Sequence, residues 1–157
     1  MNRDAAEEMI KCVPLRVPVR VKWGECDPAG VVYTVRFGDY VTLAYDSFQR
    51  HLLGGPPWKV REELGFDMPA KALSFEFLAS LRPDDEFEMT VRVADIRDRT
   101  FDIDIEALNS AGRVLFRAKL TPIAIRFGDR SAAIELPALL RQRLKQYRSR
   151  CNMPDPV

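Results

Sequence analysis

Two periodicities of apolar residues restrict the fold more than any other feature of this sequence. Between residues 73 and 127 apolar side chains recur at every second position, in segments joined by short turns. Between residues 37 and 52 they recur every three or four positions, which gives one broad stripe on a helix of about four or five turns. The stripe consists of Phe37, Tyr40, Val41, Ala44, Tyr45, Phe48 and Leu52. Such a helix needs a large apolar sheet face to cover it.

The alternating segments predict strands of one antiparallel sheet, because consecutive strands with tight connections pair in that way. They cover residues 73–81, 87–93, 101–107 and 114–127. In the last segment the apolar phase slips near Pro122, which predicts a bulge or a bend. Residues 15–23 alternate in the same manner and predict a strand before the helix. Pro137 opens a short helix through Leu140, Leu144 and Tyr147, with a basic last turn at Lys145, Arg148 and Arg150. The sequence therefore predicts an α+β domain.

Length and charge limit the classes of protein to consider. A chain of 157 residues suits a single domain, here 1–157 with a core at about 13–150 and loose tails at 1–12 and 151–157. Lys and Arg number 24 against 23 Asp and Glu, so no global field favours nucleic acid or an anionic membrane, and anion recognition must be local. No apolar run is long enough for a signal peptide or a spanning helix, which predicts a cytoplasmic protein.

Cysteine and histidine are too scarce to build a metal site or a disulfide framework. The chain has three cysteines, spread over its length, and one histidine. We therefore expect reduced thiols, no metal and no cofactor. Cys26 is a poor thiol nucleophile, because the adjacent Asp27 carboxylate raises the pKa of its thiol and His51 is far along the chain. For His51 a capping or surface position is the simpler interpretation.

The stretch from Trp23 to Tyr33 places one carboxylate, Asp27, in a Pro/Gly loop before the long helix. At that end of a helix the backbone N–H groups are unpaired and negative charge is favoured. Two interpretations follow from the residues: Asp27 caps or fixes its own loop, as Asp often does before a helix, or it attacks a bound carbonyl. In the second case the N–H groups near Tyr33 and Thr34 receive the carbonyl oxygen, and Gly30 lets the backbone approach the ligand.

This loop resembles the hallmark of the 4-hydroxybenzoyl-CoA thioesterase family of hotdog-fold proteins. The resemblance consists of the Asp-x-x-Gly loop with two aliphatic residues and an aromatic after it, and it continues through Phe37, Tyr40 and the segment 53–58 to about Phe127. It implies a curved antiparallel sheet wrapped around the helix, and a homodimer or homotetramer whose sites form between subunits. It also implies hydrolysis of an acyl-CoA thioester by Asp27, acting as a nucleophile or as a base on water.

The same resemblance assigns binding residues. Tyr33, Trp58 and Met68 would line the acyl pocket, and the Pro-Pro-Trp element favours an aroyl-CoA such as 4-hydroxybenzoyl-CoA. Arg97 and Arg99 fall where the family holds coenzyme A phosphates, although Asp98 makes a solvated turn of mixed charge an equal alternative. The Thr34 backbone N–H would receive the thioester oxygen, but the family more often has Tyr or His here. Two other functions stay open: a non-catalytic module that binds acyl-CoA or a hydrophobic ligand, and a thioesterase for acyl carrier protein.

Overall fold

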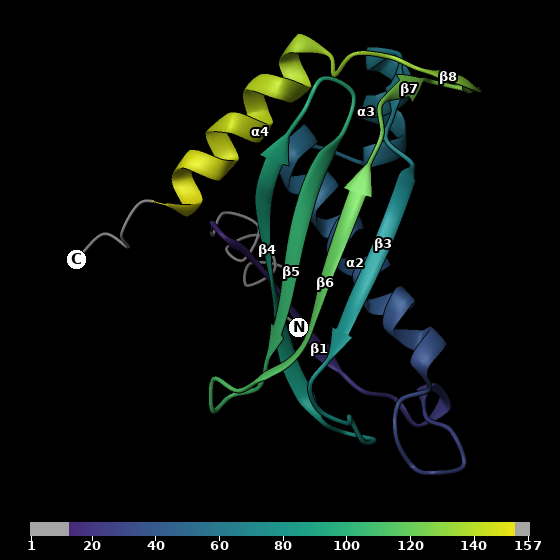
Figure 1. Ribbon diagram of the computed structural model, residues 1–157, viewed down its shortest axis with the longest axis vertical. Coiled ribbons are helices and arrows are strands. Elements are labelled where there is room, and N and C mark those ends of the chain that lie inside the picture. The colour runs from purple at the N-terminus through teal and green to yellow at the C-terminus, as the bar shows by residue number, and fades with distance from the viewer. Residues whose placement is uncertain (1–12, 153–157) are drawn as a thin grey trace.

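A five-stranded antiparallel sheet forms the body of the protein in the computed structural model, which describes residues 13–152 (Figure 1). Its strands lie in the order β1-β4-β5-β6-β3. They are β1 (Leu15–Arg20), β3 (Ala70–Phe77), β4 (Glu86–Ile96), β5 (Phe101–Leu108) and β6 (Val114–Pro122). The side chains that point to the core include Phe87, Met89, Val91, Ile103 and Ile105, so the period-two pattern of the sequence marks the buried face correctly.

The long helix α2 (Phe37–Leu53) lies across one face of this sheet (Figure 1). Phe37, Tyr40, Ala44 and Phe48 are buried against the strands, as the apolar stripe predicts. The helix ends at Gly54, whose φ of 75° is left-handed and therefore suits glycine. A sheet wrapped around one long helix is the hotdog arrangement, so the predicted fold class is confirmed.

The phase slip near Pro122 is a change of sheet. After β6 the chain bends and enters a separate three-stranded sheet of order β2-β7-β8. Its strands are β2 (Phe66–Asp67), β7 (Ile125–Arg126) and β8 (Asp129–Ala133). The pattern therefore located the bend correctly, but the second sheet was not predicted. Its strands β2 and β7 have two residues each, and the five residues of β8 are almost all exposed, so none of them shows an apolar period.

Two further departures from the sequence prediction have local causes. The first strand ends at Arg20, and Trp23 begins a 3₁₀ turn (Trp23–Glu25) that leaves its side chain 75% exposed, so the prediction of a strand to residue 23 is wrong. A short helix, α3 (Pro57–Leu64), occupies a segment predicted as loop. Its only buried residue is Pro57, so it has no apolar stripe from which a helix could be recognised.

The terminal helix α4 (Ala138–Cys151) packs on the sheet beside β4 and runs through the predicted basic last turn. Leu140, Leu144 and Tyr147 form its buried side. The Tyr147 hydroxyl accepts from the Leu15 N–H at 2.8 Å and donates to the Val91 carbonyl at 2.6 Å, which ties α4 to β1 and β4. Cys151 thus belongs to α4 and not to a tail. The other predicted tail residues, 1–12 and 153–157, lie outside the described part of the chain.

Candidate functional site

Backbone hydrogen bonds hold the Asp27 loop in one conformation. The Asp27 N–H donates to the Val31 carbonyl and the Gly30 N–H donates to the Asp27 carbonyl, both at 2.9 Å. Cys26 and Val32 then pair as an isolated antiparallel bridge. Gly30 has a φ of 77°, a left-handed conformation in which a side chain would be strained, so this turn requires glycine. Gly30 therefore fixes the position of Asp27 by setting the turn.

The Asp27 carboxylate both fixes its loop and faces an opening. Its Oδ1 accepts from the Ala29 N–H at 2.9 Å, as the loop-fixing interpretation expects. The side chain is only half-buried, and it borders a shallow surface hollow of about 290 Å³, called here the Asp27 hollow. The hollow is lined by Gly24, Glu25, Cys26, Asp27, Pro28, Tyr33 and Arg36. A ligand in the Asp27 hollow would meet this carboxylate and one guanidinium.

Two backbone N–H groups remain available as oxyanion donors. The Tyr33 N–H donates to the Glu25 carbonyl at 2.9 Å, so the prediction that it is unpaired is wrong. Thr34 opens a 3₁₀ turn (Thr34–Arg36) that runs directly into α2. Within residues 13–152 the N–H groups of Thr34 and Val35 donate to no acceptor, whereas the Arg36 N–H donates to the Tyr33 carbonyl. The predicted donor, Thr34, is thus available, and Val35 joins it.

Glu25 is a second carboxylate of this region that the sequence reasoning did not single out. Its Oε2 accepts from the Tyr40 hydroxyl at 2.7 Å and from the Lys22 N–H at 2.8 Å. Burial, and then the bond to Glu25, raises the pKa of Tyr40, which stays a hydroxyl donor at neutral pH. The pair joins the Asp27 loop to the first turns of α2. Only the spacing of two acidic residues, Glu25 and Asp27, could have pointed to it.

The predicted acyl-pocket residues do not lie together in one chain. Tyr33 is 53% exposed and lines the Asp27 hollow, whereas Trp58 is on α3, at the other end of α2 (Figure 1). The Trp58 ring packs on Phe127 with centroids 5.1 Å apart. Met68 is fully buried, and its carbonyl accepts from the Tyr45 hydroxyl at 2.8 Å. Within one chain, neither Trp58 nor Met68 lines the Asp27 hollow.

Arg97 is committed to contacts within the chain. Its Nη1 and Nη2 donate to the two oxygens of the buried Asp102 carboxylate at 3.0 and 2.6 Å, and its Nε donates to Thr100 at 2.9 Å. The Arg97 hydrogen bonds, joined by one from Thr121, hold the pKa of Asp102 below its usual range. With all three nitrogens engaged, Arg97 shapes the 97–100 turn more than it offers a phosphate site.

Arg99 and Arg141 are better placed for an anion at this turn. The Arg99 side chain makes no hydrogen bond or ion pair within residues 13–152. Arg141 reaches the turn from α4 and donates to the carbonyls of Arg97 and Asp98 at 3.0 and 3.2 Å. The 97–100 turn connects β4 to β5 at the end of the sheet opposite the Asp27 loop (Figure 1). In one chain, therefore, the candidate phosphate-binding residues and the Asp27 carboxylate lie at opposite ends of the sheet.

The structure gives no support to a thiol mechanism. Burial and the neighbouring carboxylates of Glu25 and Asp27 raise the pKa of Cys26, so its thiolate is scarce. His51 lies near the opposite end of α2, where its ring packs on Tyr147 with centroids 5.4 Å apart. Across residues 13–152 no three His, Cys, Asp or Glu side chains gather as metal ligands. No helix in the same range is long and apolar enough to cross a membrane.

Sequence comparison assigns the chain to a family. The profile of the thioesterase-like superfamily matches residues 21–145, a range that runs from the Asp27 loop into α4. The chain belongs to the thioesterase-like superfamily. Among curated proteins none matches it.

Solved thioesterase structures share the fold at low sequence identity. A gentisyl-coenzyme A thioesterase is 21% identical, covers 82% of this chain and 98% of its own, and has a TM-score of 0.71. A 1,4-dihydroxy-2-naphthoyl-CoA thioesterase from Synechocystis is 20% identical, with coverages of 83% and 94% and a TM-score of 0.72. An Asp-to-Asn mutant of 4-hydroxybenzoyl-CoA thioesterase, complexed with 4-hydroxybenzoyl-CoA, is 20% identical, with coverages of 82% and 96% and a TM-score of 0.74. These similarities establish the hotdog fold.

Proposed function

We propose that this protein hydrolyses acyl-CoA thioesters to a free acid and coenzyme A, with Asp27 as the essential carboxylate. One observation carries the proposal: Asp27 borders an open hollow just before α2, where the N–H groups of Thr34 and Val35 have no acceptor within residues 13–152. A carboxylate that is followed in the chain by unpaired N–H donors at the start of a helix supplies the groups that a thioester needs under attack, since negative charge then gathers on its oxygen. Membership of the thioesterase-like superfamily supports the same reaction.

The chemistry allows two routes. As a base, Asp27 takes a proton from water while the water oxygen bonds to the carbonyl carbon. As a nucleophile, Asp27 bonds to that carbon itself and forms a mixed anhydride, which water then hydrolyses. In both routes the Thr34 and Val35 N–H groups receive the carbonyl oxygen, the carbon–sulfur bond breaks, and the coenzyme A thiolate takes up a proton. The half-buried Asp27 side chain is compatible with either route.

Aroyl thioesters are the favoured substrates, with 4-hydroxybenzoyl-CoA as the first example to try. Three structurally similar proteins are named for aromatic acyl-CoA substrates. In this chain Tyr33 offers a flat, half-exposed ring beside Asp27. The exposed Trp58 remains a candidate for the acyl pocket, whereas Met68 is fully buried in its own chain and offers no surface to a ligand. Arg99, with Arg97 beside it, remains a candidate for the phosphates. Both Trp58 and Arg99 would act from a neighbouring subunit.

The edges of the sheet support assembly through β3. The edge strand β1 carries Pro18 and the charged side chains of Arg16 and Arg20, which form ion pairs with β4; proline and charge on an edge strand discourage further strand pairing. The opposite edge, β3, has no proline, and its apolar side chains Leu73 and Phe77 are 43% and 48% exposed. A second copy that pairs with β3 would cover them. We infer that two chains form a homodimer through β3. Two such dimers can associate to form a tetramer.

Light scattering tests this assembly. The wild-type protein is expected to have the mass of two or four chains. Leu73→Glu places a charge on the proposed interface and is expected to shift the mass toward one chain, because an unpaired charge is costly to bury. Leu139→Glu is the matched control, since Leu139 is 39% exposed but lies on α4. Equal masses for wild type and Leu73→Glu, or equal shifts for both variants, would contradict assembly through β3.

Release of free thiol tests the catalytic function. Purified protein is expected to release coenzyme A from benzoyl-CoA and 4-hydroxybenzoyl-CoA, and to act more slowly on aliphatic acyl-CoAs of similar size. The reason is that a flat ring favours an aromatic acyl group over a flexible chain. Tight binding of these thioesters without thiol release would instead indicate a non-catalytic acyl-CoA module. A faster reaction with aliphatic substrates would contradict the aroyl preference and leave hydrolysis intact.

A further inference from the structure

Glu25 joins three segments of the chain around the Asp27 loop, residues 22–33. Its Oε2 accepts from the Tyr40 hydroxyl at 2.7 Å and from the Lys22 N–H at 2.8 Å. Its main chain donates to the Lys22 carbonyl at 3.0 Å and accepts from the Tyr33 N–H at 2.9 Å. One half-buried residue thus contacts the beginning of the loop, the end of the loop and α2.

The Tyr40 hydroxyl is a fixed point for this contact. The Tyr40 side chain is 3% exposed. Its ring packs on those of Phe37, Phe87 and Phe116, with centroids 6.0, 5.3 and 6.5 Å away. A hydrogen bond from a hydroxyl to a carboxylate is charge-assisted and about twice as strong as one between neutral groups. The packed core of the protein therefore sets where the Glu25 carboxylate lies.

Glu25 lies between the two halves of the candidate site. Asp27 follows it by two residues in the chain. On the other side the Tyr33 N–H bonds to the Glu25 carbonyl. The N–H groups of Thr34 and Val35, which donate to no acceptor within residues 13–152, come directly after Tyr33. A shift of Glu25 would therefore change the distance between the Asp27 carboxylate and these donors.

Other hydrogen bonds of the loop do not replace this contact. Backbone bonds within residues 27–31 fix the shape of the turn. The Val32 N–H donates to the Leu81 carbonyl at 2.8 Å, which ties the loop to the chain after β3. The bond between Glu25 and Tyr40 ties the loop to α2, the helix that continues from the unpaired N–H donors.

We propose that Glu25 and Tyr40 are positioning residues, whose hydrogen bond holds the Asp27 loop at a fixed place relative to the start of α2. This inference rests on the proposed thioester hydrolysis, in which the Asp27 carboxylate and the Thr34 N–H must both reach one carbonyl group. A misplacement of about 1 Å at a reacting centre can cost about 100-fold in rate. A bond that keeps carboxylate and donor in place therefore affects kcat.

A second catalytic base is the main alternative role for the Glu25 carboxylate, because Glu25 also borders the Asp27 hollow. The hydrogen bonds favour positioning. The Glu25 Oε2 accepts from two protein donors, whereas the Asp27 Oδ1 accepts from the Ala29 N–H. An oxygen with two donors in place has less capacity left for a water molecule or a ligand.

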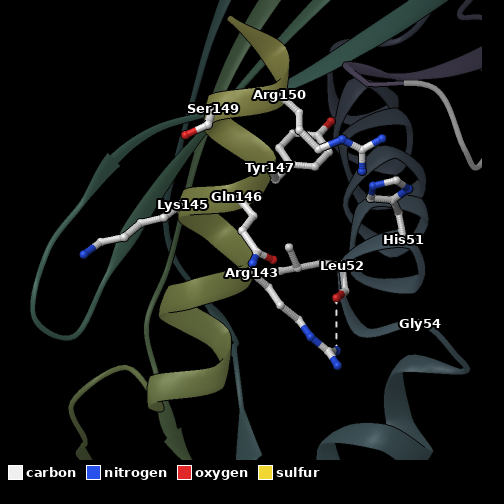
Figure 2. A pocket seen from close by; sticks show the side chains of 9 residues that line it. All are labelled: His51, Leu52, Gly54, Arg143, Lys145, Gln146, Tyr147, Ser149 and Arg150. Carbon is white, nitrogen blue, oxygen red and sulfur yellow. Dashed lines mark hydrogen bonds between the residues drawn. The ribbon is translucent and has the colours of Figure 1, made fainter. Parts of the chain in front are cut away.

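The test removes the hydroxyl from each of two buried tyrosines. Tyr40→Phe breaks the proposed contact. Tyr147→Phe is the matched control, because Tyr147 is also 3% exposed and its hydroxyl bonds to the Leu15 N–H and the Val91 carbonyl. Tyr147 lies on α4 beside His51, at the opposite end of α2 from Tyr40 (Figure 2). A loss of activity confined to Tyr40→Phe therefore reports position in the fold and not the loss of a buried hydroxyl.

Two substitutions of Glu25 separate its hydrogen bonds from its charge. Glu25→Ala removes both, whereas Glu25→Gln keeps an acceptor oxygen at the same reach. For all four variants, thiol release from benzoyl-CoA gives kcat and KM, and thermal unfolding gives the stability. Amide hydrogen exchange of the Tyr33 N–H reports opening of the loop independently of activity.

The expected result is a loss of kcat without a loss of binding. Tyr40→Phe and Glu25→Ala should lower kcat about tenfold and keep KM within about twofold, because the bond aligns reacting groups and does not bind the substrate. Both should speed exchange of the Tyr33 N–H. Glu25→Gln should be about threefold or more faster than Glu25→Ala, since it keeps an acceptor for Tyr40. Tyr147→Phe should lose at least as much stability as Tyr40→Phe, but kcat and exchange should not change.

Three outcomes would overturn the inference and leave the proposed function intact. An equal loss of kcat in Tyr40→Phe and Tyr147→Phe would show that the bond supports only the fold. An unchanged kcat in Tyr40→Phe would show that the bond does not position the site. Glu25→Gln that is no faster than Glu25→Ala would show that the charge of Glu25, and not its hydrogen bond, is required.

A wild-type protein that releases no thiol would refute the proposed function instead. Exchange of the Tyr33 N–H then decides whether the bond holds the loop. Faster exchange in Tyr40→Phe alone would support that part of the inference. Equal exchange in Tyr40→Phe and Tyr147→Phe would overturn it.

Discussion

Asp27→Asn is expected to lower kcat/KM for an acyl-CoA thioester by roughly 10²- to 10⁴-fold, the usual loss when a catalytic acid or base is removed. Asparagine has the shape of aspartate, and its carbonyl oxygen can still accept from the Ala29 N–H, so the loop keeps its turn. What it lacks is a negative charge that can take a proton or form an anhydride. The variant therefore separates the two interpretations of this residue, because only the catalytic one predicts a large loss. The rate of thiol release from the acyl-CoA measures this loss of kcat/KM.

The controls for this experiment address stability and charge. Thermal unfolding of Asp27→Asn should match that of wild type to within a few degrees, since no buried contact is lost. Asp39→Asn removes a carboxylate from the first turn of α2 that pairs with Arg36 at 3.1 Å, and it should cost less than about threefold in rate. If Asp27→Asn retains more than a tenth of the wild-type rate while folding normally, Asp27 is a structural loop residue and the proposed mechanism is refuted.

Local patterns predicted the fold well where each element buries a face of its own. The stripe of α2 and the alternation of β4, β5 and β6 each mark one buried surface, and the structure places these elements as the patterns indicate. Elements that bury almost nothing were missed: α3 has one buried residue, and β2 and β7 have two residues each. In such segments tertiary context, not periodicity, decides the backbone conformation.

For the candidate site, the sequence indicated the carboxylate of Asp27 but did not indicate correctly which backbone N–H groups are unpaired. Asp27 could be found because a Pro/Gly loop before a long helix can be recognised from the amino-acid sequence alone. The Tyr33 N–H could not be assigned, because its partner, the Glu25 carbonyl, meets it only when the loop folds back. The pairing of Arg97 with Asp102 likewise connects two neighbouring strands across a turn. Pairings of this kind depend on how each loop or turn folds back on itself, which apolar periodicity does not reveal.

The aromatic cluster beneath the site depends on Phe116. This fully buried ring of β6 has its centroid 5.2 Å from that of Phe37, 6.5 Å from that of Tyr40 and 5.7 Å from that of Phe87. Phe37 and Tyr40 belong to the first turn of α2, and Tyr40 bonds to Glu25 of the loop that carries Asp27. Phe116 thus connects the middle of the sheet to the elements that position Asp27, the proposed catalytic carboxylate.

Phe116→Ala is therefore expected to lower the free energy of unfolding by about 3–5 kcal/mol, because it leaves a cavity between three rings that cannot all move inward. Urea denaturation at one fixed protein concentration measures the loss, since an oligomer gains stability with concentration. Phe127→Ala is the matched control: this half-buried ring packs on the exposed Trp58, and its loss should cost about 1 kcal/mol. Because Phe116 lies under the start of α2, its variant should also lose thioesterase activity below its unfolding transition, whereas Phe127→Ala should be less affected. Equal destabilisation by the two substitutions would show that the aromatic cluster does not hold α2 against the sheet.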